Sequence, residues 1–102
     1  IFTINGLMEV PVPEDVSLVG AYPNPFNPAT TINFELSDNS KVLMQVYNIQ
    51  GRLVATLVDY RMNAGYQSVV WNAVDHSSGV YFVRMSVNGV ADNNIIKLLL
   101  VK

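Results

Sequence analysis

The chain has 102 residues, half of them hydrophobic, no cysteine and a net charge of −2 at pH 7. This length suits one small domain with a sandwich core, and the lack of cysteine excludes a disulfide framework, a thiolate nucleophile and a cysteine-based zinc site. The six basic residues are scattered and the apolar runs are short, which argues against a nucleic-acid-binding surface and against a transmembrane helix of about 20 residues.

The first 16 residues are predicted to be a linker or the end of a preceding domain. The segment from Val10 to Asp15 contains two prolines and two acidic side chains, a composition typical of an extended, semi-rigid connection. The chain starts with Ile1 rather than Met, and no basic segment followed by a long apolar one marks a signal peptide. We therefore expect a C-terminal piece of a larger protein, with its domain over residues 17–102.

A proline-rich segment opens this domain, Tyr22-Pro23-Asn24-Pro25-Phe26-Asn27-Pro28. Each of its three prolines fixes its own φ and pushes the residue before it towards extended geometry. The two asparagines between them tolerate turn conformations. Directly afterwards, Thr31 to Leu36 alternates polar and apolar residues, which predicts a strand with one buried face. The segment is therefore predicted to be a stiff turn that leads into a β-domain.

Short strand-like runs alternate with turn signals along the rest of the chain. We predict strands over Ser17–Ala21, Thr31–Leu36, Lys41–Ile49, Arg52–Val58, Tyr66–Asn72, Val80–Val87 and Ile95–Val101. Gly51 is a natural site for a positive φ, and Asn88-Gly89 between two apolar runs is a strong hairpin signal. No window shows a sustained helical period with caps. About seven strands with regularly spaced turns predict an all-β fold, an immunoglobulin-like antiparallel β-sandwich.

The last predicted strand, from Ile95 to Val101, is apolar on both faces apart from Lys97, and Lys102 follows it. If this strand lies at the edge of a sheet, its unpaired backbone groups and apolar side chains must be protected from other chains or bound by a partner. The sequence leaves open whether the strand is buried at the end of the fold or offers an edge for docking. An open edge would also allow a homodimer by strand pairing or swapping.

The sequence predicts no enzyme, no cofactor and no metal site. His76 is the single histidine, and beside Asp75 in a turn we expect it to be a solvated loop residue. Ser77 and Ser78 follow it too closely to converge on it as a nucleophile on its base. No glycine-rich loop opens a helix to cradle phosphate, and the Asp and Asn residues of the loops match no calcium-loop spacing.

Aromatic side chains suggest polysaccharide binding as an alternative function. Trp71 and several tyrosines would form a stacking platform if they shared an exposed face. In the run from Tyr66 to Trp71, however, the indole shares its parity with Val69 and opposes Ser68, which predicts that it fills the core. An exposed Trp71 would favour glycan binding, and a buried one removes its main support.

The segment from Pro23 to Ile32 closely resembles the opening of the type A C-terminal sorting domain of the type IX (Por) secretion system. The same pattern opens related domains similar to the Ig-like domain of the flagellar hook-capping protein. Further similarities follow in order over Val46–Leu57, Asn63–Asn72, Ser78–Arg84 and the basic-apolar-basic ending Lys97–Lys102, so that the resemblance covers Ser17 to Lys102. One departure is a short loop over residues 73–77, where the family usually has a longer one. It puts a recognition role of that loop in doubt but not the fold.

The resemblance implies a non-catalytic address at the C-terminal end of exported proteins of Bacteroidota-like bacteria. Such domains are read by outer-membrane translocation machinery, are often cleaved off, and leave their cargo attached to surface lipopolysaccharide. The implied partners are therefore the outer-membrane secretion and attachment machinery and an N-terminal cargo domain, with no nucleic acid. The implied location is the cell surface or the medium, reached through the periplasm.

Two surfaces are expected to carry recognition. The proline-rich turn has a restricted backbone that loses little entropy on docking, and the last strand is suited to β-augmentation. The candidate residues are Tyr22, Pro23, Asn24, Pro25, Phe26, Asn27, Pro28, Lys97, Leu98, Leu99, Leu100, Val101 and Lys102. A competing interpretation is a corner that merely seats the first strand. Phe26 is expected to pack inward under either interpretation.

Other functions remain open on the sequence. The main alternative is an accessory Ig-like module of a secreted glycoside hydrolase or adhesin, which binds polysaccharide or acts as a spacer. A subunit-contact domain like that of the flagellar hook cap is disfavoured, because the proline-rich opening combined with a terminal lysine looks more like the exported-cargo group.

Overall fold

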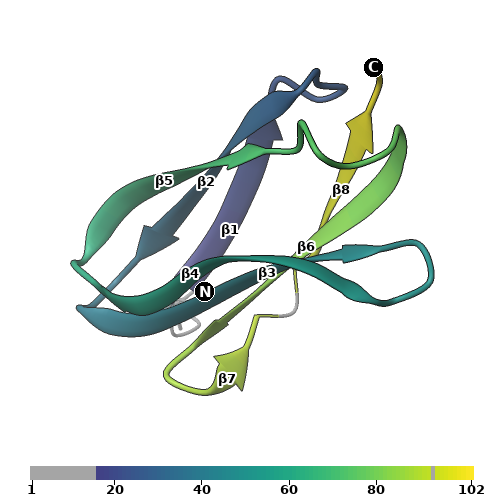
Figure 1. The fold of residues 1–102 in the computed structure, drawn as a ribbon. Coiled ribbons are helices and arrows are strands. Elements are labelled where there is room, and N and C mark those ends of the chain that lie inside the picture. Colours follow the sequence, from purple (N-terminus) through teal and green to yellow (C-terminus); the bar gives the residue numbers. More distant parts are fainter. Residues whose placement is uncertain (1–15, 93) are drawn as a thin grey trace, which may run out of the picture.

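The structure is a computed structural model that describes residues 16–92 and 94–102, which form β-strands joined by turns (Figure 1). The strands are β1 (Val16–Tyr22), β2 (Ala29–Leu36), β3 (Ser40–Asn48), β4 (Leu53–Met62), β5 (Gly65–Asn72), β6 (Gly79–Val87), β7 (Val90–Ala91) and β8 (Ile96–Leu100). All seven predicted strands are present, and β7 is an additional short one. Of the predicted linker, only Val16 lies within the described residues.

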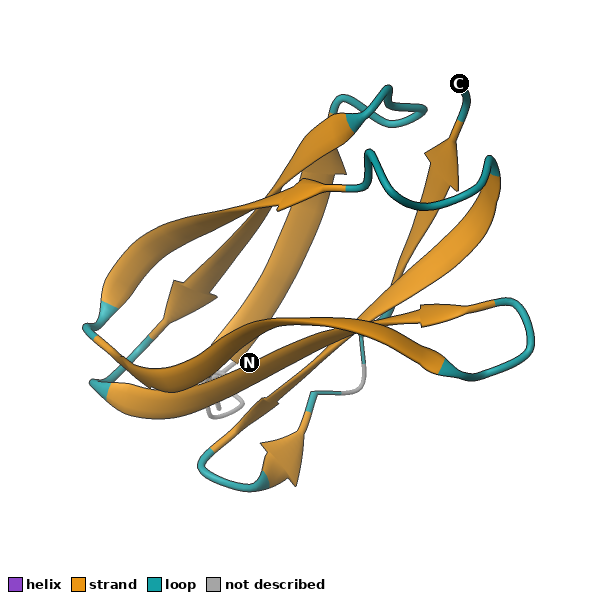
Figure 2. Cartoon of the chain, in the orientation of Figure 1, coloured by secondary structure: helices purple, strands orange, loops and turns teal. Residues whose placement is uncertain are grey.

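The strands form two antiparallel sheets that face each other (Figure 2). The smaller sheet has the order β1-β2-β5, and the larger has the order β4-β3-β6. On the remaining side of β6, β7 pairs with Ser86 and Val87, while β8 pairs with the segment from Gly79 to Val83. This arrangement confirms the predicted all-β, immunoglobulin-like antiparallel sandwich.

The core lies between the sheets and follows the alternation of the sequence. In β2, every second residue from Ile32 to Leu36 is buried, and in β3 the same holds from Val42 to Val46. Side chains at alternate positions of a strand share one face, so these residues meet across the sandwich. Each fully buried aliphatic or aromatic side chain contributes about 1.5–3 kcal/mol relative to exposure.

Two turns form as their residues predict. Asn88 and Gly89 have φ angles of 51° and 84° and join β6 to β7, which confirms the predicted hairpin. Gly51 has a φ of 81° in the turn between β3 and β4. The side-chain oxygen of Asn48 closes that turn, because it accepts hydrogen bonds from the backbone amides of Gln50 and Arg52, both at 3.0 Å.

The two ends of the sandwich carry different parts of the chain. One end, called the turn end, holds the turn over residues 23–28, the loop over residues 73–78 and residues 101–102 (Figure 1). The register explains this grouping, because Ala29 pairs with Asn72 and Gly79 pairs with Leu100. At the opposite end the chain enters β1 at Val16, which pairs with Leu36.

Candidate functional site

The proline-rich turn lies directly along the last strand. The backbone amide of Phe26 donates to the carbonyl of Leu99 at 2.9 Å, and the amide of Val101 donates to the carbonyl of Phe26 at 3.0 Å. These two bonds form a short parallel bridge at the edge of β8 that does not face β6. The two segments predicted as separate recognition surfaces therefore form one continuous surface.

The side chain of Asn24 extends this contact. Its oxygen accepts a hydrogen bond from the backbone amide of Leu99 at 3.0 Å, and its nitrogen donates to the carbonyl of Lys97 at 2.8 Å. An amide side chain offers the same donor and acceptor as a peptide group. Asn24 thus takes the place that a residue of a neighbouring strand would occupy along β8.

Further hydrogen bonds fix the turn on the sandwich. The buried hydroxyl of Thr30 donates to the carbonyl of Pro23 at 2.7 Å, which ties the beginning of the turn to β2. The amide of Ala73 donates to the carbonyl of Pro28 at 2.8 Å, which ties the end of the turn to the loop after β5. The peptide bonds before Pro23, Pro25 and Pro28 are cis.

An aromatic cluster anchors the turn in the core. Phe26 and Trp71, each only 3% exposed, have ring centroids 5.6 Å apart. Tyr81 lies edge-on to the indole at 5.2 Å, and its hydroxyl donates to the carbonyl of Ser77 at 2.6 Å. The predicted burial of Trp71 and the inward packing of Phe26 are confirmed. Buried in this way, the indole offers no face for stacking on a sugar.

His76 lies in a loop, as predicted, but it also belongs to this cluster, and the prediction that it is solvated is wrong. Its ring is half-buried, with its centroid 5.5 Å from that of Trp71 and 6.1 Å from that of Tyr81. The short loop folds back after Trp71, because the amide of His76 donates to the carbonyl of Ala73 at 2.9 Å. The imidazole thereby covers the edge of the aromatic core.

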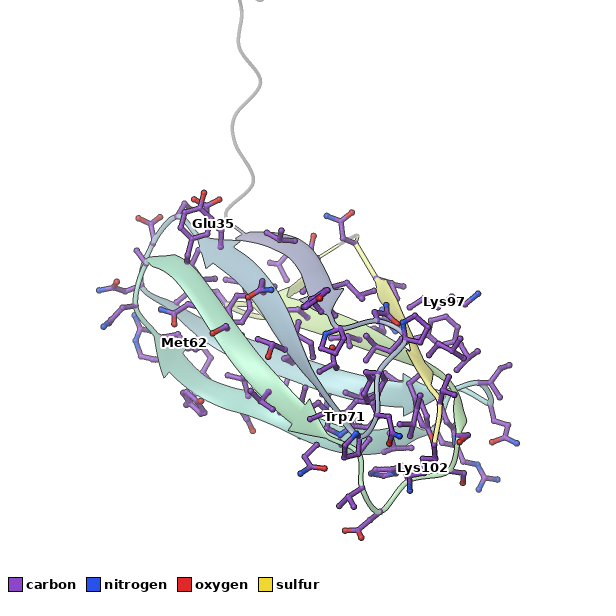
Figure 3. The ribbon with its side chains drawn as sticks, turned by 90° about the horizontal axis from the view of Figure 1, so that it is seen from above. Glu35, Met62, Trp71, Lys97 and Lys102 are labelled. Atoms are coloured by element: carbon purple, nitrogen blue, oxygen red, sulfur yellow. The ribbon has the colours of Figure 1, made fainter. Side chains whose placement is uncertain are left out.

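The same loop holds the last residue of the chain. The amide of Lys102 donates to the hydroxyl of Ser78 at 3.0 Å, and its ammonium donates to the carbonyl of Val74 at 2.7 Å. In Figure 3 the labelled Trp71 and Lys102 lie towards one end of the sandwich, away from Glu35 and Met62. The loop over residues 73–78 is therefore part of the turn end, a position that its sequence does not indicate.

The candidate residues divide between an inner and an outer face. Leu98 and Leu100 of β8 are buried in the core together with Phe26. The exposed candidates are Tyr22, Pro23, Asn24, Pro25, Asn27, Lys97, Leu99, Val101 and Lys102, and Pro28 is half-buried. An incoming partner that meets the folded domain therefore has access to the exposed set and not to the three core residues.

The described residues hold no group that indicates catalysis. No cluster of three or more histidine, cysteine or acidic side chains suited to a metal ion is found among residues 16–92 and 94–102. His76 contacts aromatic rings, and no described hydrogen bond joins it to an acid or a hydroxyl nucleophile. Within the same ranges, no helix is long and apolar enough to cross a membrane.

Comparison with known families gives a match over nearly the whole described domain. The model of the family described as "Secretion system C-terminal sorting domain" matches residues 20–102. A comparison with curated proteins found no match. The matched segment begins inside β1 and includes the turn, the aromatic cluster and β8.

Solved structures with the same fold include two from Porphyromonas gingivalis. The structure of dimeric latent PorU matches with a TM-score of 0.71 and 20% identity over 93% of this chain and 10% of that one. PorZ, described as an essential bacterial surface component of the type-IX secretion system, matches with a TM-score of 0.54 and 25% identity over 80% of this chain and 11% of its own. This chain therefore spans about a tenth of the length of either protein.

A third structure shows that the architecture is shared more widely. The sensor domain of the anti-sigma factor RsgI4 from Pseudobacteroides cellulosolvens matches with a TM-score of 0.57 and 7% identity. The match covers 84% of this chain and 92% of that domain. At this identity the likeness concerns the fold alone.

Proposed function

The chain belongs to the family of secretion system C-terminal sorting domains of the Por, or type IX, system, and we propose that its turn end is the surface by which the export machinery reads it. Members of this family direct the secretion of the protein that carries them, to the cell surface or the medium, and are not catalytic. The family assigns this role to the domain as a whole. The proposal concerns which part of the domain carries the address.

One observation carries the proposal: the proline-rich turn and the last strand are hydrogen-bonded into a single surface. Asn24 and Phe26 contact Lys97, Leu99 and Val101 through four hydrogen bonds of 2.8–3.0 Å. A rigid surface loses little conformational entropy when a partner docks on it. This surface is fixed by the aromatic cluster beneath it and by the loop that holds Lys102.

The exposed side chains give this surface a mixed character. Leu99 and Val101 are apolar and 39% and 50% exposed, and Lys97 and Lys102 flank them. An apolar centre with charged residues at its rim is the usual composition of a protein–protein interface. We infer that the partner is a protein of the outer-membrane secretion and attachment machinery, with an apolar patch bordered by acidic groups.

Residues 17–102 are proposed to act as one transferable unit. The residues before them are proposed to be a linker that follows an N-terminal cargo domain. No nucleic acid is expected to take part. A glycan-binding accessory module is less well supported, because Trp71 is enclosed by Phe26, His76 and Tyr81.

The test is a secretion assay in a host with an active type IX system. A fluorescent reporter with an export signal carries residues 9–102 at its C-terminus, and reporter is measured in the periplasm, on the surface and in the medium. Removing β8 would not be informative by itself, because Leu98 and Leu100 are core residues and the truncated domain would unfold. Point changes at exposed positions, Lys102→Ala and Leu99→Ala, are therefore preferred.

Matched controls lie at the opposite end of the sandwich. Lys41→Ala removes an exposed lysine, and Tyr66→Ala removes an exposed apolar side chain. We expect reporter to remain in the periplasm with the two turn-end variants and to be secreted with the two controls. If the intact fusion is secreted and all four variants are secreted equally well, the turn end is not the recognised surface. If the intact fusion folds and stays in the periplasm, this domain does not act as an address in that host.

A further inference from the structure

The turn occupies the strand-pairing groups along the outer edge of β8 from the carbonyl of Lys97 to the amide of Val101. Those groups are the carbonyl of Lys97, the amide and the carbonyl of Leu99, and the amide of Val101. The side chain of Asn24 takes the first two contacts, and the backbone of Phe26 takes the others. An edge strand that lacked such a cover would present a row of unpaired donors and acceptors to other chains.

The covered groups are self-complementary. In an antiparallel pair, two residues that face each other exchange their amide–carbonyl hydrogen bonds. A two-fold axis at Leu99 would pair Leu99 with its own copy, and would pair Val101 with Lys97 of the second copy. The four groups listed above form four of the six hydrogen bonds of this pairing, and the amide of Lys97 and the carbonyl of Val101 form the other two, so that β8 fits a second β8 without any shift of register.

The side chains along the edge favour the same partner. Leu99 and Val101 point outward and are partly exposed, so that the pairing would bring apolar side chains together across the axis. Lys97 would face the second copy's Val101, so that no lysine lies directly opposite a lysine. The described side chains thus place no like-charge repulsion directly across the pairing.

We propose that Asn24 is an edge guard, which keeps β8 from pairing with the β8 of a second copy of this chain. Its side-chain amide competes for the positions that the second strand would take. Displacing Asn24 exposes the carbonyl of Lys97 and the amide of Leu99 and loosens the turn that covers the rest of the edge. The inference concerns self-association and does not depend on which surface the export machinery reads.

The variant that tests the guard is Asn24→Ala, and its matched control is Asn27→Ala. Asn27 is also an exposed asparagine before a proline in the same turn, but its side chain forms no hydrogen bond with residues 16–92 or 94–102. A double variant, Asn24→Ala with Thr30→Val, removes a second anchor of the turn. We expect sedimentation velocity to give a dimer dissociation constant about tenfold lower for Asn24→Ala than for the parent, and lower still for the double variant. Asn27→Ala should behave like the parent.

The pairing itself is tested with single cysteines, which the chain otherwise lacks. Leu99→Cys in the Asn24→Ala background should form an intermolecular disulfide under mild oxidation, because the two copies of residue 99 lie opposite each other. Asn33→Cys, on the outer face of the other sheet, should not. A dimer that forms without cross-linking through residue 99 would contradict the proposed pairing.

Two outcomes overturn the guard. In the first outcome, the fluorescence of Trp71 shows that Asn24→Ala and the double variant are folded, and sedimentation velocity shows that both are as monomeric as the parent. The other is read in the parent protein, so that it does not depend on how the variants fold. If the amide of Leu99 exchanges its hydrogen as fast as an exposed amide, Asn24 does not cover the edge. Should Asn24→Ala unfold, Asn24→Asp replaces it, because Asp keeps the acceptor for Leu99 and loses the donor to Lys97.

Discussion

The ring of Phe26 lies 5.6 Å from the ring of Trp71 at an interplanar angle of 49°, so that the proline-rich turn has its own side chain in the core. Tilted aromatic pairs at this separation are favourable beyond the area that they bury. The turn is therefore coupled to the stability of the sandwich as well as to the shape of the surface above it.

Phe26→Ala is expected to destabilise the domain by about 3–5 kcal/mol, because it leaves a cavity beside Trp71 and removes a nearly fully buried ring. Chemical denaturation followed by the fluorescence of the single tryptophan measures this change. Tyr22→Ala in the same segment is the control, since Tyr22 is 79% exposed and its removal should change the stability by less than about 0.5 kcal/mol. Equal effects of the two changes would show that Phe26 does not anchor the turn.

Replacing the neighbouring leucines 98 and 99 of β8 by alanine is expected to change the free energy of unfolding by very different amounts. Leu98 is fully buried, and Leu98→Ala should cost about 2–5 kcal/mol. Leu99 points outward, and Leu99→Ala should cost less than about 1 kcal/mol. Urea unfolding of the two variants under the same conditions compares them, and similar midpoints would mean that the strand lies in the other register.

The hydroxyl group of Thr30 is expected to contribute more to the stability of the turn than its methyl group does. Thr30→Val keeps the volume and removes the hydrogen bond to Pro23, which should cost about 0.5–1.5 kcal/mol. Thr30→Ser keeps the hydroxyl and loses one methyl group. The rate of hydrogen exchange at the amide of Phe26 reports whether the turn stays bound to β8. This rate should increase in Thr30→Val but not in Thr30→Ser. The reverse order would assign the role of Thr30 to its methyl group.

Gly20 and Gly89 both have room for a side chain, so that substituting them isolates the effect of a positive φ on stability. A Cβ at Gly89 or at Gly20 meets no other atom within 4 Å, but only Gly89 has a positive φ. Gly89→Ala should therefore cost about 1–2 kcal/mol, because a residue with a Cβ is strained in that conformation. Gly20→Ala should leave the stability within about 0.5 kcal/mol of the parent or raise it. Thermal unfolding distinguishes the two, and a neutral Gly89→Ala would contradict the described turn.

The strands and the core were predictable because their signals are local. The alternation from Ile32 to Leu36 fixes which side chains are buried, and Asn88-Gly89 fixes a hairpin. The predicted end of one edge strand is wrong, because the last residues of that strand have the polar composition of a loop. β4 continues to Met62, whereas the sequence predicts that it ends at Val58. Asp59 and Arg61 are exposed on that strand, and their polarity hid its continuation.

The candidate site was predicted in its parts but not in its assembly. The turn and the last strand were both identified, yet nothing in the sequence indicates that the side chain of Asn24 reaches a strand 75 residues later. The same applies to the loop that holds Lys102, because its contacts depend on how the two sheets pack. The sequence neighbours of His76 predict a solvated side chain, whereas the rings of Trp71 and Tyr81 set its position in the structure.

The direction of β1 has a consequence for whatever precedes it. Val16 lies at the end opposite the turn, and the seven residues of β1 cover about 20 Å at the usual rise per residue. The point at which the preceding polypeptide joins the described domain therefore lies at the end opposite Asn24, Leu99 and Lys102. Under the proposed function, the cargo and the recognised surface are thus attached to opposite ends of one rigid sandwich, so that the same recognised surface can serve cargo proteins of different shapes.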